Sequence, residues 1–225
     1  MGMPSTLLAR SSGNREEKKL GTTKDSEKTR GKIIEAAGRL FAEKGFNGVT
    51  VRDIVRKADT HLSALNYHFR TKEALYREVV LEASRACMTS SEDREQLAQL
   101  DPREAVFLIV KEMMVGHGKG ESWPWQLSII NRECWEPSGV FNELAETYLK
   151  PEAEFLAGIL AQVVGRPSNS HSVRFAVVML TGMLDSLAYE HYMNAIAPGL
   201  IEHGMTDDWF AKQITHLLIE AASTD

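Results

Sequence analysis

Helical spacing of apolar side chains runs from Ser26 to the C-terminus, and it constrains the fold more than any other feature of this sequence. Val, Ile and Thr never alternate with polar residues over the length of a strand, so no sheet is expected. The pattern predicts helices over residues 26–44, 51–58, 61–69, 72–89, 101–115, 123–135, 139–164, 170–196 and 207–222. The expected fold class is therefore all-α.

The segment from Thr50 to Phe69 predicts two short helices joined by a tight turn. Thr50 is a good N-cap, and Asp53 three residues later completes something close to a capping box. Asp59 and Thr60 form the turn. In the second helix, the large apolar side chains Leu62, Leu65 and Phe69 fall at helical spacing, so they are expected to pack inward. This arrangement fits a helix-turn-helix.

The opposite face of helix 61–69 carries hydrogen-bonding or small side chains. They are His61, Ser63, Ala64, Asn66, Tyr67 and His68. In a helix-turn-helix the second helix presents its N-terminal residues to base edges, and Asn can pair with adenine. A solvated face beside a core is the competing interpretation. No nucleophile and base accompany this face, so DNA reading is favoured over catalysis.

The charge distribution separates the two ends of the chain. Residues 1–80 carry a net charge of +6, whereas residues 81–225 carry −11. This asymmetry favours an electrostatic footprint at the N-terminal end. Residues 1–25 have few large apolar side chains and are expected to form a disordered basic tail. Its cations, Arg10, Arg15, Lys18, Lys19 and Lys24, either contact DNA or merely lie near it.

The remaining composition indicates a cytoplasmic protein. There is no apolar run of about 18 residues to span a membrane and no secretory h-region. Cys87 and Cys134 have neither metal spacing nor a disulfide framework, which suits a reducing cytosol. The histidines also lack close ligand spacing, so no metal site and no cofactor are expected; those considered are His117, His191, His203 and His216.

Residues 29–80 closely resemble the DNA-binding domain of TetR-family transcriptional regulators. The segments "LFAEKGF", "TVRDIVRKA" and "YHFRTKEAL" carry the resemblance together. It implies an all-α homodimer, with a three-helix helix-turn-helix domain at 26–72 and a larger ligand-binding and dimerisation bundle at 73–225. One departure lies in the turn, where many members have Gly-Val and this chain has Asp59-Thr60. Aspartate tolerates positive φ better than most residues, so the turn is expected to survive.

The resemblance implies a set of DNA contacts. Thr50 and Arg52 would touch phosphate at the helix start, and Lys72 matches the phosphate-binding lysine of the family. His61, Ser63, Ala64 and Asn66 would face bases, while Tyr67 and His68 would reach the backbone. The partner would be a double-stranded operator.

The C-terminal part resembles the CecR-like subgroup through "NRECWEPSGVFNELAETYLKPEAEFLAGIL", which implies an unknown small-molecule ligand. Apolar groups with a few polar ones are typical of ligand pockets, although the same residues also suit a core. Arg132 and Glu133 could pair with each other or orient a ligand. The ligand-binding candidates are Phe107, Met113, Trp123, Trp125, Arg132, Glu133, Met179, Met183, Asp185 and Tyr189.

Helices 170–196 and 207–222 carry wide apolar stripes, which predict either an internal core or a homodimer built through both helices.

The favoured function is a repressor released from a palindromic operator by a ligand. An activator or co-repressor-dependent regulator of the same fold stays open. An enzyme using Glu133, His117 or Asp185 as acid-base groups lacks a cofactor motif, and a pure protein-interaction module would leave the helix-turn-helix unexplained.

Overall fold

The computed structural model describes the backbone of residues 10–117, 124–187, 195–197 and 208–224, and most of their side chains. Every element in these ranges is helical, which confirms the all-α prediction. The chain forms two compact units, residues 1–82 and 83–225. Within the described ranges, no helix is both long and apolar enough to cross a membrane.

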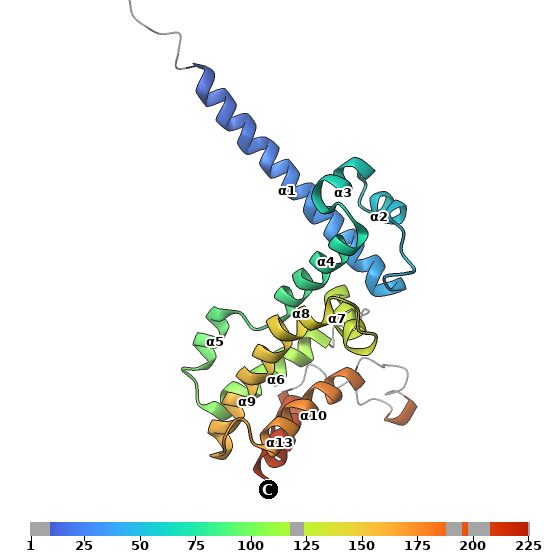
Figure 1. Ribbon diagram of the computed structural model, residues 1–225. Helices are drawn as coiled ribbons and strands as arrows, with labels where there is room; N and C mark the ends of the chain where they lie inside the picture. Colours follow the sequence, from blue (N-terminus) through green and yellow to red (C-terminus); the bar gives the residue numbers. More distant parts are fainter. Residues whose placement is uncertain (1–9, 118–123, 188–194, 198–207, 225) are drawn as a thin grey trace, which may run out of the picture. The chain divides into compact units, whose positions relative to one another are not determined.

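Unit 1 contains α1 (Arg10–Lys44), α2 (Val51–Lys57), α3 (Leu62–Phe69) and most of α4 (Lys72–Cys87) (Figure 1). Phe41 and Tyr76 meet edge to face in its core, with ring centroids 5.0 Å apart. Arg30 on α1 donates a 2.8 Å hydrogen bond to Glu78 on α4, and its guanidinium lies 5.6 Å from the Phe69 ring centroid. These contacts hold α1, α3 and α4 together.

The structure starts α1 at Arg10, whereas the sequence predicted a disordered segment up to residue 25. That prediction used the scarcity of large apolar side chains, which measures packing and does not exclude helical backbone. The first fully buried side chain described on α1 is Ile33. The part of α1 that packs therefore falls inside the range that the sequence predicted.

Unit 2 contains seven further α-helices and one π-helical segment among the described residues. They are α5 (Ser91–Leu97), α6 (Pro102–His117), α7 (Trp125–Trp135), α8 (Phe141–Leu144), η1 (Ala145–Leu149), α9 (Lys150–Val164), α10 (His171–Leu187) and α13 (Asp208–Ser223). Buried residues of α6, α9, α10 and α13 form one continuous core. An ion pair of 2.6 Å between Lys111 and Asp208 joins α6 to α13.

Two elements of unit 2 differ from the sequence prediction. α5 was not predicted, because it has no buried residue and therefore no apolar periodicity. The single helix expected over 139–164 is divided, since the π-helix η1 interrupts it between α8 and α9. Its predicted end is confirmed: Gly165 follows α9 with φ +66°.

The two units divide between Glu82 and Ala83, inside α4. The sequence placed the boundary at residues 72–73, where a new helix begins. The division between the units falls within α4, so neither end of this helix coincides with the boundary. The assignment of DNA binding and ligand binding to the two halves stays a prediction.

Candidate functional site

The start of α2 is fixed by a reciprocal pair of hydrogen bonds. The Thr50 hydroxyl accepts from the Asp53 backbone N–H at 3.2 Å, and the Asp53 carboxylate accepts from the Thr50 N–H at 3.1 Å. These bonds form the predicted capping box. The side-chain hydrogen bond from Thr50 is the main cause that lowers the pKa of Asp53. The Thr50 hydroxyl, predicted to touch phosphate, therefore also serves as an internal cap.

The turn between α2 and α3 depends on a residue in left-handed conformation. Asp59 has φ +49°, as predicted for an aspartate in the place of the usual glycine. The Thr60 N–H donates a 3.0 Å hydrogen bond to the Val55 carbonyl and closes the end of α2. Asp59 thus adopts the left-handed conformation without glycine.

The face of α3 predicted to contact DNA lies at the surface. His61, Ser63, Asn66 and Tyr67 are exposed, and Ala64 and His68 are half-buried. Tyr67 has 79% of its surface exposed.

The inward face of α3 differs from the prediction at one position. Leu65 and Phe69 are buried, whereas Leu62 is 50% exposed. The prediction that Leu62 packs inward is wrong, because the spacing of four between Leu65 and Phe69 already fills the side of this short helix that faces the core.

Lys72 has internal partners as well as its predicted phosphate role. Its ammonium donates a 2.8 Å hydrogen bond to the Val49 carbonyl and lies 4.1 Å from the Phe46 ring centroid. Arg52 is exposed on α2. The exposed Arg52 on α2 and the half-buried Lys72 on α4 thus lie on the helices before and after α3.

The predicted ligand-binding residues are spread over unit 2. Phe107, Met113 and Met183 are half-buried against the core of α6, α9, α10 and α13. Trp125 is buried on α7 and Met179 is half-buried on α10. Trp123, Tyr189 and the side chain of Asp185 lie outside the described residues.

Arg132 and Glu133 each have a partner close in sequence. Arg132 forms a 3.5 Å ion pair with Glu136. The fully buried Glu133 carboxylate accepts hydrogen bonds from the Ser138 N–H at 3.2 Å and the Ser138 hydroxyl at 2.9 Å. Glu133 therefore holds the segment that follows α7.

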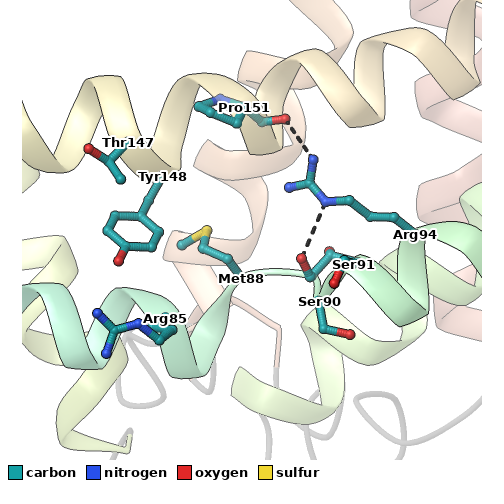
Figure 2. Close-up of a pocket in the computed structure, with 9 residues that line it drawn as sticks. Arg85, Met88, Ser90, Ser91, Arg94, Thr147, Tyr148 and Pro151 are labelled. Carbon is teal, nitrogen blue, oxygen red and sulfur yellow. Dashed lines mark hydrogen bonds between the residues drawn. The ribbon is translucent and has the colours of Figure 1, made fainter.

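Unit 2 also has a pocket of about 310 Å³ that the sequence did not predict (Figure 2). Its walls come from the end of α4, the start of α5, the π-helix and the start of α9. The lining residues are Arg85, Met88, Thr89, Ser90, Ser91, Arg94, Thr147, Tyr148 and Pro151. One local signal existed: Ser90 and Asp93 have N-cap spacing, and the Ser90 hydroxyl accepts from the Asp93 N–H at 3.1 Å. In the described part of the chain, no group of three or more His, Cys, Asp or Glu could hold a metal ion.

Family models match both units. Residues 33–79 match the model of bacterial regulatory proteins of the tetR family, and residues 102–207 match the C-terminal domain of the HTH-type transcriptional dual regulator CecR. The first match contains the end of α1, all of α2 and α3, and the first half of α4. The second begins at the first residue of α6.

Individual proteins agree with these matches. The "Probable HTH-type transcriptional regulator YttP" of Bacillus subtilis is 35% identical over 134 residues, which is 55% of this chain and 59% of that protein. IcaR of Staphylococcus epidermidis, a negative regulator of a biofilm operon, is 43% identical over 49 residues, 22% of this chain and 26% of its own. The chain thus matches less than two thirds of the length of either relative.

A solved structure extends the likeness to most of the fold. A HlyIIR mutant carrying a linker with two thrombin sites superposes with a TM-score of 0.65 at 20% identity, over 84% of this chain and 96% of that one. This likeness shows the fold alone. The two family models, over residues 33–79 and 102–207, together match more than half of the chain, and on these matches the chain belongs to the TetR family of transcriptional regulators.

Proposed function

We propose that this protein is a repressor that binds a palindromic operator as a homodimer and is released by a small-molecule ligand. The observation that carries the proposal is the exposed face of α3, where Asn66 and Tyr67 are exposed while Leu65 and Phe69 of the same helix are buried. An eight-residue helix of this kind can enter the major groove and present its first two turns to base edges.

The phosphate contacts would come from the residues around α3. Arg52 on α2 and Lys72 at the start of α4 carry positive charge, and Thr50 lies at the N-terminus of α2. Such contacts position a protein on the duplex, whereas side chains of α3 select the sequence. His61, Ser63, Ala64 and Asn66 are the residues proposed to select it. IcaR, which this chain matches over 26% of its length, is itself a negative regulator, which favours repression over activation.

The homodimer is proposed to form through α10 and α13. These helices pack together in unit 2, and both keep large apolar side chains at the surface. Phe175 and Val178 on α10 are 59% and 69% exposed, and Leu217 on α13 is 50% exposed. Covering these side chains with the same helices of a second copy would build a four-helix interface.

Release would follow from a shift between two states of the dimer. Two recognition helices can occupy successive major grooves only when they lie about 34–36 Å apart. A ligand that prefers a dimer of different spacing weakens operator binding by its differential affinity, typically ~1–3 kcal/mol. We assign the transmission to α4, because this one helix runs through residues of both compact units.

The first experiment is selection from a random duplex pool, followed by titration of the enriched sequence. We expect an inverted repeat, and we expect Asn66→Ala to lower affinity for it by about 1–3 kcal/mol. The matched control is Asn142→Ala, the same change at an exposed position of α8 in unit 2. If no sequence is enriched, or if both variants bind like the wild type, α3 does not read DNA.

A further inference from the structure

We propose that Arg70, at the turn between α3 and α4, contacts a backbone phosphate of the operator. The DNA contacts expected from the sequence pass from His68 directly to Lys72 and omit this residue. The contact depends on the proposed function, because it requires a DNA duplex as the partner. The experiment below separates the failure of the contact from the failure of that function.

The backbone of Arg70 is strained. Its φ of +62° and ψ of −51° lie in a region that glycine enters freely and that a residue with a Cβ rarely adopts. Two hydrogen bonds fix this conformation. The Arg70 N–H donates to the Asn66 carbonyl at 3.1 Å, and the Thr71 N–H donates to the Phe69 carbonyl at 2.6 Å. Glycine would meet the same backbone demand at lower cost, so the arginine side chain has to offset the strain.

The described part of unit 1 provides no contact that offsets this strain. Arg70 is exposed, and its guanidinium forms no hydrogen bond, ion pair or ring contact with any described residue. The other described non-glycine residue with positive φ is Asp59, and aspartate tolerates that region better than arginine does. Residue type and backbone therefore disagree at Arg70, and such disagreements are characteristic of functional positions.

The other arginines of unit 1 show that most guanidiniums here are paired with carboxylates. Six arginines of this unit have described side chains. Four of them form ion pairs: Arg30 and Arg77 with Glu78, Arg39 with Glu35, and Arg56 with Asp53. Arg52 and Arg70 form none with the described residues. Arg52 is already expected to touch phosphate, and Arg70 carries the same accessible charge on the other side of α3 along the chain.

The position of Arg70 favours phosphate over a base edge. Residues at the start of a recognition helix read bases, whereas Arg70 follows the last residue of α3. Tyr67 and His68, expected to reach the DNA backbone, lie in the last turn of this helix, and Lys72 follows two residues after Arg70. A guanidinium stays protonated and offers a planar fork of donors to phosphate oxygens. We therefore assign one phosphate to Arg70 of each subunit.

Duplex titrations of the full-length protein over a range of salt concentrations test the contact. They use the operator from the random-pool selection and an unrelated duplex of equal length. Arg70→Gln should reduce the slope of log affinity against log salt concentration by about 0.9 for each lost contact, about 1.8 for a homodimer. Affinity should fall roughly tenfold or more on both duplexes, because phosphates carry no sequence information. Arg70→Lys keeps the charge and should keep the slope.

Arg39→Gln is the matched control. It removes the same charge from the same unit, at an exposed arginine that is paired with Glu35 at 2.6 Å. Its slope and affinity should equal those of the wild type. Arg70→Gly adds a second measurement that a purely structural role would not reproduce. Relief of the strain should raise its Tm, while the lost contact should weaken its binding to DNA.

An unchanged slope in a folded Arg70→Gln variant would overturn the contact and leave the proposed function intact. A loss of affinity confined to the selected operator, without a change of slope, would place Arg70 on a base edge and also reject the phosphate contact. A wild type that binds both duplexes alike contradicts sequence selection, while the slope of Arg70→Gln on the unrelated duplex still decides the contact. A wild type that binds neither duplex rejects both.

Discussion

The Lys72 ammonium donates a 2.8 Å hydrogen bond to the carbonyl of Val49, the residue directly before the N-cap of α2. The same ammonium lies over the Phe46 ring. One side chain thus joins the start of α4 to the start of α2. Lys72 has a structural role even without DNA, so a loss of operator binding in a Lys72 variant needs a stability measurement beside it.

The first prediction concerns that bond. Lys72→Ala removes a charged donor and a cation–π contact, so the free energy of unfolding should fall by about 2 kcal/mol. Urea denaturation followed by circular dichroism measures the change. Lys28→Ala, at an exposed position of α1, should change stability by less than about 0.5 kcal/mol. If the two variants have equal free energies of unfolding, Lys72 has no structural role.

Arg70 carries backbone strain between α3 and α4. Its φ of +62° and ψ of −51°, with a 2.6 Å hydrogen bond from the Thr71 N–H to the Phe69 carbonyl, describe a γ-turn that L-residues rarely adopt. Arg70→Gly should therefore raise the free energy of unfolding by about 1 kcal/mol. The control, Arg52→Gly, places glycine inside helix α2 and should lower stability by roughly the same amount. A destabilised Arg70→Gly variant would show that the arginine side chain outweighs the strain.

Glu133 is fully buried and accepts two hydrogen bonds from Ser138. Glu133→Ala should lower the free energy of unfolding by about 2–3 kcal/mol, since a buried cavity forms and the Ser138 donors lose their acceptor. Glu136→Ala, three residues further on and exposed, should cost much less. Thermal denaturation of both variants checks the prediction. A small effect at Glu133 would contradict its structural role.

The two cysteines should react at different pH. Burial raises the pKa of Cys87 from 9.0 to about 11, whereas Cys134 is exposed. Only the thiolate is alkylated, so iodoacetamide should label Cys134 first at pH 8. In Cys134→Ser, the labelling rate of Cys87 should rise with pH until about 11; a plateau near 9 would contradict the predicted burial.

The same shift makes stability depend on pH. The raised folded-state pKa means that the contribution of the Cys87 thiol is complete below about pH 9 and is lost as the pH rises to about 11. Cys87→Ser should remove this part of the alkaline loss of stability, which denaturation at pH 8 and pH 10.5 would measure.

Sequence reasoning succeeded where local physics decides the structure. The Thr50–Asp53 capping box and the positive φ of Asp59 depend on a few neighbouring atoms, and both are confirmed. It failed for α5, which has no apolar face to detect, and for η1, because a π-helical turn leaves no compositional trace. The pocket beside Tyr148 combines two segments far apart in the chain, residues 85–94 and 147–151, so no spacing within the sequence could indicate it.

Residues with positive φ, Asp59 and Arg70, lie on either side of the eight-residue helix α3. Inserting one residue in α3 would rotate every later side chain by about 100° and turn Leu65 or Phe69 out of the core. The length of α3 therefore cannot change without loss of its core packing. If α3 reads the operator as proposed, a change of DNA target requires an exchange of side chains at fixed positions, and related regulators of different specificity should align through this segment without gaps.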